Sequence, residues 1–206
     1  AGKSERLPKS KPLLKFGSFT FIEDALNTLT SSTIEMVVVV LGHQWKELKN
    51  SINTDKIKGF NKIRFIVNPS YKEGKFRSLQ FGVNYLLANF TEMEGSVISM
   101  VDHPGIKAET INSLINAFKV DLVDVAVPVL KSKTRTKKGH PIVISNKIMQ
   151  KIRDADTKED RFDDIILGAK SGTISVAVTD SAILRNINTD KAYKSLLEEV
   201  RLISYS

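Results

Sequence analysis

The first seventeen residues, Ala1 to Gly17, have the composition of a loop that binds an anion. Gly2 and Ser4 would let backbone N–H groups approach an anion closely, and Arg6 and Lys11 would bring positive charge to it. This pattern favours a triphosphate, although neither G-x-x-x-x-G-K-[ST] nor G-x-G-x-x-G occurs in it. Taken alone, the stretch is equally consistent with a basic, disordered tail, because Lys, Ser and Pro are enriched in it.

Asp102 is the most specific single candidate for chemistry. It follows an apolar run, residues 97–101, and is itself followed by His103 and Pro104. A carboxylate in this position can hold a Mg²⁺ ion that bridges phosphate oxygens. The alternative is an aspartate that caps a turn or a helix, since a helix is predicted to begin at about residue 108.

Two other polar stretches are candidates. Residues 186–190 precede the last predicted helix, where Asn188 or Thr189 would make an ordinary N-cap. Gly139-His140-Pro141 follows a basic run, and a lone histidine is more often structural than functional. A basic run is usually a solvated loop, but beside a phosphate-transfer site it could hold a phosphate. This one lacks the interleaved aromatic residues of a nucleic-acid patch; its members are Lys133, Arg135, Lys137 and Lys138.

The composition is that of a globular protein and excludes several classes. With 206 residues, 41% of them hydrophobic and 26% charged, one domain spanning residues 1–206 is expected. The absence of cysteine excludes disulfides, thiolate metal sites and thiol nucleophiles. No apolar run reaches the length of a membrane helix and no signal peptide is apparent, which fits a cytoplasmic protein without a membrane partner. The net charge of +8 favours anionic partners without choosing among them.

Apolar periodicity predicts strands that alternate with helices, which indicates an α/β domain with a mostly parallel sheet. Ligands of such sheets bind outside the carboxyl ends of the strands, where Asn68 and Asp102 fall. The connector 131–140 is expected to form a flap on the substrate side. The expected strands are 36–41, 63–67, 97–101, 123–130, 141–145 and 173–178, and the expected helices are 19–30, a short one containing Trp45 and Leu48, 80–90, 108–118, 146–153, 161–169 and 189–203.

The order of these motifs resembles the MobA-like NTP transferases, the molybdenum-cofactor nucleotidyltransferase-like family. Their signature loop reads roughly A-G-x-S-x-R-[ML]-G-x-x-K-x-L-L-x-[FY]-G, and Pro8 stands where the family usually has glycine. The resemblance implies a Rossmann-like three-layer domain with the nucleotide-diphospho-sugar transferase fold. It also implies that Ala1, Gly2, Lys3 and Ser4 bind nucleotide. The matching positions are Ala1-Gly2, Ser4, Arg6-Leu7, Lys11, Leu13-Leu14 and Phe16-Gly17.

The segment from Val67 to Gly82 is similar to the family pattern V-N-P-x-[WY]-x-x-G-x-x-x-S-L-x-x-G. In the family this segment flanks the nucleobase, which implies nucleotide-binding roles for Asn68, Ser78 and Leu79. Close helix packing explains Gly82 at least as well as a ligand role does. The segment is closer to the cytidylyltransferase branch than to the guanylyltransferase branch, whose Gly-Pro-Leu-Ala-Gly run is absent. CTP is therefore the expected nucleotide, with GTP as the second choice.

The resemblance also implies the metal ligands and the acceptor side. Asp102 corresponds to the family's metal-binding aspartate, and Asn188 falls at the second metal position of the pattern D-I-D-T-P. Both aspartates of that pattern are asparagines here, Asn186 and Asn188, which lowers the local negative charge and could weaken metal affinity or activity. Residues expected on the acceptor side are His103, Pro104, Gly139 and His140.

The implied reaction is nucleotidyl transfer, in which an acceptor phosphate attacks the α-phosphorus of an NTP and pyrophosphate leaves. Arg6 and Lys11 would stabilise the triphosphate and the leaving pyrophosphate, while Asp102 and Asn188 would hold Mg²⁺. The acceptor in the cytidylyltransferase branch is molybdopterin; a sugar or alcohol phosphate is the enzymatic alternative. Two other classes stay open: a nucleotide- or pterin-binding assembly factor with slow turnover, and a basic nucleic-acid-binding module supported by net charge alone.

In this family the signature loop follows a short buried strand, and no residue precedes Ala1 here. We therefore expect the natural chain to carry an apolar strand upstream of the loop.

Overall fold

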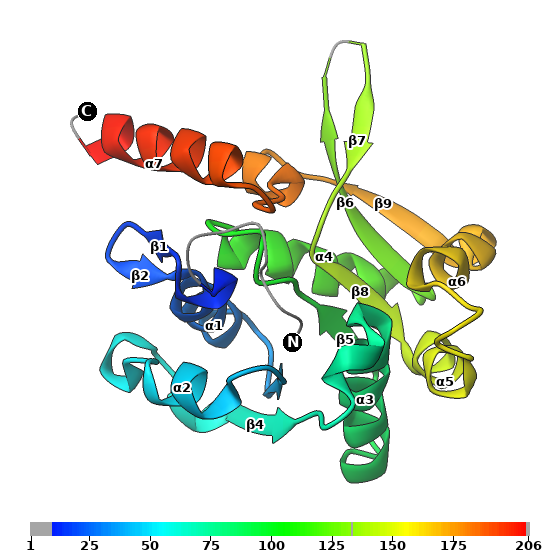
Figure 1. Cartoon of the computed structure of the whole chain (residues 1–206). Helices are drawn as coiled ribbons and strands as arrows, with labels where there is room; N and C mark the ends of the chain where they lie inside the picture. The colour runs from blue at the N-terminus through cyan, green and yellow to red at the C-terminus, as the bar shows by residue number, and fades with distance from the viewer. Residues whose placement is uncertain (1–9, 133, 205–206) are drawn as a thin grey trace.

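The structure is a computed structural model, and it describes residues 10–132 and 134–204. Helices and strands alternate through most of this range (Figure 1). The helices are α1 (Phe21–Ser31), α2 (Trp45–Asn50), α3 (Lys75–Asn89), α4 (Ala108–Asp121), α5 (Asn146–Asp154), α6 (Phe162–Gly168) and α7 (Asp190–Ser204). The strands are β1 (Lys15–Phe16), β2 (Phe19–Thr20), β3 (Val37–Leu41), β4 (Ile63–Val67), β5 (Gly95–Ile98), β6 (Val125–Lys131), β7 (Thr136–Lys138), β8 (Ile142–Ser145) and β9 (Thr173–Ala177).

The largest sheet contains five strands in the order β5-β8-β6-β7, with β9 paired to β6. Strand β8 runs antiparallel to both β5 and β6, whereas β9 runs parallel to β6. Strands β5, β6 and β9 therefore point in one direction, and β7 and β8 point the other way. The sheet is mixed because β8 returns beside β6 after the β6–β7 hairpin, which projects from the body of the molecule in Figure 1.

A second, two-stranded sheet is formed by β3 and β4, which pair in parallel from Val37 with Ile63 to Leu41 with Val67. Within the described residues β3 pairs only with β4 and β5 only with β8, so both strands keep an edge without a strand partner. A cavity lies between these two edges, and its lining includes the whole of β3 and of β5.

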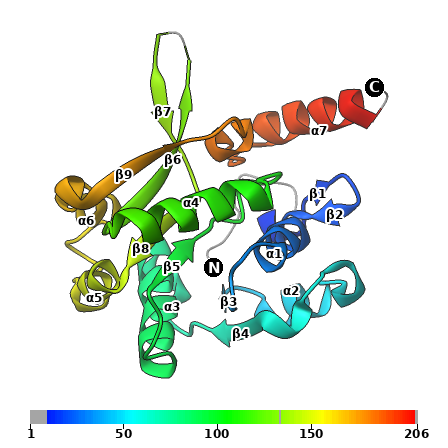
Figure 2. The same cartoon turned by 180° about the vertical axis from the view of Figure 1, so that it is seen from behind.

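The helices cover both faces of the five-stranded sheet. Alternate residues of β6 point to opposite faces, as the pleat of a strand requires. Val125 and Val127 pack in a core with Ile148 and Met149 of α5 and with α3, whereas Ala126 packs in a separate core with α4. Figure 2 shows α4 crossing the sheet on the side opposite to α3 and α5 in Figure 1. This arrangement is the α/β layering that the sequence predicts.

The start of α1 is fixed by a capping box. The Thr20 hydroxyl accepts a hydrogen bond from the Glu23 amide, and Glu23 Oε2 accepts one from the Thr20 amide at 2.7 Å. The second carboxylate oxygen of Glu23 accepts from the Asn53 amide at 2.9 Å. Although burial alone would raise its pKa, these hydrogen bonds hold the pKa of Glu23 below its ordinary value.

Most predicted elements are confirmed within a few residues, and the differences have local causes. Strand β5 ends at Ile98, three residues before the predicted end, because its partner β8 begins at Ile142, opposite Ile98. Helix α3 begins at Lys75 rather than at residue 80, directly after Gly74. The predicted connector 131–140 includes a strand, β7, whose ladder to β6 pairs Lys131 with Thr136. No helix in the described part of the chain is long and apolar enough to cross a membrane.

Candidate active site

Three side chains that the sequence predicts at one site do meet in the structure. The Lys11 ammonium lies 3.1 Å from Asp102 Oδ2 and also donates a hydrogen bond to Asn188 Oδ1. These residues are 91 and 177 positions from Lys11 in the chain, so only the tertiary fold brings them together. The Lys11 and Asp102 side chains are 14% and 13% exposed, which makes their ion pair largely shielded from water.

Backbone contacts hold the three segments in place. Lys11 begins a short 3₁₀ turn, Lys11–Leu13, and the next residue, Leu14, is buried in a core with Phe21 and Leu196. The Ile187 amide donates to the Asp102 carbonyl at 3.0 Å. That bond joins the loop that carries Asp102 to the segment that carries Asn188.

The electrostatic balance at Asp102 favours its charged form. Burial raises the pKa of Asp102, but the charge and hydrogen bond of Lys11, followed by His103 and Lys75, bring it below its ordinary value. Asp102 is therefore a carboxylate at neutral pH. Lys75 stands at the start of α3 and also lines the cavity. The only signal for Lys75 in the sequence is its position inside the segment from Val67 to Gly82.

The residues at this point fit a cation. Asp102 Oδ2 and Asn188 Oδ1 converge on one positive group, the Lys11 ammonium. Among the described residues there is no cluster of three or more His, Cys, Asp or Glu side chains that could hold a metal by themselves. Mg²⁺ in phosphate-transfer sites is commonly held by one or two carboxylates together with substrate phosphates. One carboxylate and one amide oxygen match that pattern and leave room for phosphate oxygens.

Two histidines lie beside the carboxylate. The rings of His103 and His140 are edge to face with centroids 5.0 Å apart, and His103 Nε2 is 3.9 Å from Asp102 Oδ1. Burial and the neighbouring His140 lower the pKa of His103, and burial lowers that of His140, so both rings are neutral at pH 7. Both Nδ1 atoms are buried without a hydrogen-bond partner among the described residues.

His140 is placed by close backbone packing. The His140 amide donates to the Ile183 carbonyl at 3.0 Å, and the Gly139 amide donates to Pro128 O at 3.0 Å. A Cβ at Gly139 would lie 2.8 Å from Ile183 Cβ and closer still to the Ile183 carbonyl group. Glycine is required here by close approach of two backbone segments. The structure thus brings His140, which follows Gly139, against His103, which lies beside Asp102 and precedes Pro104.

Asn68 and Ser78, predicted to bind nucleotide, are buried and bonded to each other. Asn68 Nδ2 lies 3.1 Å from Ser78 Oγ, while Asn68 Oδ1 accepts from the Ser70 amide at 2.9 Å. In this arrangement Asn68 shapes the loop between β4 and α3. Ser78 and Leu79 line the cavity, as do Lys11 and Asp102.

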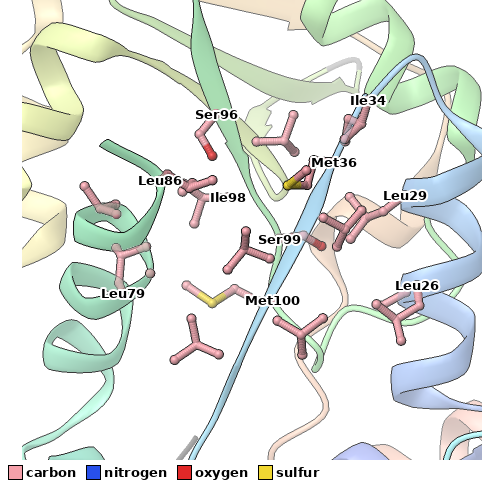
Figure 3. Close-up of a pocket in the computed structure, with 18 of the residues that line it drawn as sticks. Leu26, Leu29, Ile34, Met36, Leu79, Leu86, Ser96, Ile98, Ser99 and Met100 are labelled. Atoms are coloured by element: carbon pink, nitrogen blue, oxygen red, sulfur yellow. The ribbon is translucent and has the colours of Figure 1, made fainter. Parts of the chain in front are cut away.

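The cavity has a volume of about 1670 Å³ and runs from the predicted site into the interior. In Figure 3, Leu79 and Leu86 of α3 stand on one side of β3, and Leu26 and Leu29 of α1 stand on the other. Ligand pockets usually measure about 300–1,000 Å³. This space exceeds that range, and within the described residues the edges of β3 and β5 that have no strand partner line its inner part, between the two sheets.

Several predictions lie elsewhere or outside the described residues. Ala1, Gly2, Lys3, Ser4 and Arg6 are outside them, so the geometry of the first part of the loop is not described. The basic residues Arg135, Lys137 and Lys138 are exposed on the β6–β7 hairpin. Gly82 packs against β3, where a Cβ would lie 2.8 Å from Val40 Cγ2. That contact confirms the packing interpretation of this glycine.

Several solved structures share this fold. A homologue of Rv0371c from mycobacterium sp. strain JC1 aligns with TM-score 0.77 and 23% identity over 98% of this chain and 94% of that one. Rv0371c of Mycobacterium tuberculosis H37Rv, solved in complex with manganese, aligns with TM-score 0.70 and 16% identity over 92% and 91%. A CMP:2-keto-3-deoxy-manno-octonic acid synthetase complexed with CTP aligns with TM-score 0.68 and 16% identity over 98% and 94%. The fold is that of the nucleotide-diphospho-sugar transferases.

The sequence itself matches the MobA-like NTP transferase domain over residues 1–170. The chain belongs to the MobA-like NTP transferase family, and so to the nucleotidyltransferase class of enzymes. A curated relative, named nicotine blue oxidoreductase, from Paenarthrobacter nicotinovorans, is 26% identical over 148 residues, which cover 70% of this chain and 67% of the relative.

Proposed function

We propose that this protein transfers CMP from CTP to a phosphorylated small molecule, with Mg²⁺ and with release of pyrophosphate. The observation that carries the proposal is the convergence of Lys11, Asp102 and Asn188 on one point in the lining of the cavity. The family resemblance assigns these residues to the triphosphate and its metal independently of any contact between them. They come from three distant parts of the chain, which gives the contact weight as support.

The proposed chemistry is mainly positioning and charge neutralisation. Asp102 is held as a carboxylate and Asn188 offers a neutral oxygen beside it, so the pair would hold Mg²⁺ against the triphosphate. Bound Mg²⁺ would supply the charge that screens the phosphates from an attacking oxygen. Lys11 would then turn its ammonium toward the triphosphate and the leaving pyrophosphate, together with Arg6. The nucleotide-binding roles of Ala1, Gly2, Lys3, Ser4, Asn68, Ser78 and Leu79 are part of the same proposal.

The acceptor would approach from the side of His103 and His140. Their buried Nδ1 atoms lack partners among the described residues, and each neutral imidazole can donate or accept one hydrogen bond there. The basic residues of the β6–β7 hairpin would attract a phosphorylated acceptor. Molybdopterin is our first choice, from the resemblance to the cytidylyltransferase branch, and a sugar or alcohol phosphate is the alternative. We expect a cytoplasmic protein without a nucleic-acid or membrane partner.

A second candidate function is nucleotide or pterin binding with slow turnover. It is favoured by one feature of the site, the amides of Asn186 and Asn188 where the family pattern has aspartates. With a single carboxylate, the site attracts a divalent ion less strongly, and Lys11 competes for the same oxygens. The relative named as an oxidoreductase is consistent with varied activities within the family.

The test is binding of CTP, GTP, ATP and UTP with and without Mg²⁺, followed by pyrophosphate release with candidate acceptors. The protein used would carry an apolar strand ahead of residue 1. We expect Mg²⁺-dependent preference for CTP, lost in Asp102→Ala and kept in Asp121→Ala, which removes an exposed carboxylate at the end of α4. Tight nucleotide binding without pyrophosphate release in the presence of any acceptor would favour the second candidate. Failure of all four nucleotides to bind at millimolar concentration would refute nucleotidyl transfer and nucleotide binding alike.

A further inference from the structure

The half-buried guanidinium of Arg185 contacts two of the three segments that carry the predicted site, and Arg185 itself lies in the third. Arg185 Nη1 donates to the Pro104 carbonyl at 3.0 Å, two residues after Asp102. The Arg185 Cζ atom lies 5.7 Å from the centroid of the Phe16 ring, and Phe16 belongs to the segment that follows Lys11. Arg185 itself precedes Asn188 by three residues. The side chain is 17% exposed, and its outer nitrogen pairs with Glu199 of α7.

A hydrogen bond from the neighbouring Gly105 to α1 also holds the loop that follows Asp102. The Gly105 amide donates to Asp24 Oδ2 of α1 at 2.8 Å. Gly105 has φ +81°, and a Cβ there would lie 2.8 Å from Phe16 Cζ and closer still to Arg185 Nη1. The loop therefore packs directly on the guanidinium. Burial raises the pKa of Asp24, while the Gly105 hydrogen bond and the charge of Arg185 act in the opposite direction.

We propose that Arg185 is a positioning residue that sets the placement of Lys11, Asp102 and Asn188 relative to one another. The proposal rests on the proposed nucleotidyl transfer for its effect on rate. An arginine suits this position because its planar group offers N–H donors in several fixed directions and can also stack on an aromatic ring. Lysine would keep the charge near Asp24 and Glu199 but could not make the same set of contacts.

Loss of these contacts should affect turnover more than nucleotide binding. Displacement of reacting groups by about 1 Å can lower a rate by about 100-fold. We expect Arg185→Gln to lower kcat about 10- to 100-fold while the KM for CTP changes less than about threefold. Arg185→Lys should fall between wild type and Arg185→Gln. The matched control is Arg153→Gln, since Arg153 is exposed and pairs with its neighbour Asp154.

The decisive measurement pairs kinetics with amide hydrogen exchange by NMR. Arg185→Gln should speed exchange of the Gly105 amide about tenfold or more relative to amides of α4 and β6, and Arg153→Gln should not. Millimolar guanidinium should restore part of the turnover of Arg185→Gln without changing its thermal stability. Unchanged Gly105 exchange in Arg185→Gln, or equal acceleration at all amides, would overturn the proposal.

The two proposals fail in different ways. If the wild-type protein transfers no nucleotide, the proposed function is wrong, and the exchange of Gly105 in the variants still decides whether Arg185 positions the loop. If the wild type is active and Arg185→Gln keeps its full kcat, the positioning role is wrong and the proposed function stands.

Discussion

Replacement of Asn188 by aspartate should strengthen metal binding, because it restores a second carboxylate beside Asp102. Both Asn188 Oδ1 and Asp102 Oδ2 contact the Lys11 ammonium, so the two carboxylates would stand about 5 Å apart with a positive group between them. At an effective dielectric constant of 20, attraction to the ammonium at about 3 Å is roughly 5 kcal/mol, and repulsion at about 5 Å is roughly 3 kcal/mol. The variant should therefore fold.

The gain in metal affinity follows from the same estimate. Even at the dielectric constant of water, a unit charge about 4 Å from a divalent ion is worth about 2 kcal/mol, or about 30-fold in affinity. Competition from Lys11 reduces this gain, so we expect Asn188→Asp to bind Mn²⁺ or Mg²⁺ about tenfold more tightly in the presence of CTP. Electron paramagnetic resonance titration with Mn²⁺ and calorimetry with Mg²⁺ would both measure it.

The matched control is Asn186→Asp. Asn186 is exposed, and its carboxamide accepts from Asn188. The same added charge at this position lies farther toward solvent and should raise metal affinity less than about threefold. Equal gains in both variants would show a general effect of charge. No gain in Asn188→Asp would refute the convergence of Asp102 and Asn188 on a metal position.

Three other predictions concern folding and the cavity. Glu23→Gln should lower the free energy of unfolding by about 1 kcal/mol at pH 7. The folded protein lowers the pKa of Glu23, so the carboxylate stabilises the fold at a pH above its pKa in the unfolded chain, and this stabilisation is lost as the pH falls through its pKa in the folded protein. Urea unfolding at pH 7 and pH 3.5 checks this, with exposed Glu92→Gln as control; an equal cost at both pH values would contradict it. Gly139→Ala should force a methyl group against Ile183 and lower the free energy of unfolding by about 1–3 kcal/mol. A calorimetric scan should then show a Tm lower by about 3–10 °C, and an unchanged Tm would contradict the close packing. An amino-terminal extension of about five apolar, β-branched residues should raise Tm by filling the gap between β3 and β5, whereas a polar extension of equal length should not; equal Tm values would show that the gap accepts no strand.

The order of elements could be predicted because it depends on local patterns. The run of four valines and Leu41 in β3 and the helical periodicity of α4 each appear within one short window of sequence. The family motifs were also readable, since the signature loop and the segment from Val67 to Gly82 are contiguous. Strand pairing was less accessible. The antiparallel placement of β8 between β5 and β6 depends on which edges are free when the chain returns, and no local pattern encodes that.

The residue types of the site were determined by the sequence alone: a lysine, an aspartate and an asparagine at positions 11, 102 and 188. Only the tertiary structure decided that their side chains meet, that burial and Lys11 together set the pKa of Asp102, and that Asn68 and Ser78 bond to each other. Arg185 and Asp24 had no signal in the sequence, because their role comes from contacts with backbone groups of a distant loop. Such contacts depend on the position of a carbonyl or an amide in space, and every residue in the chain carries those groups.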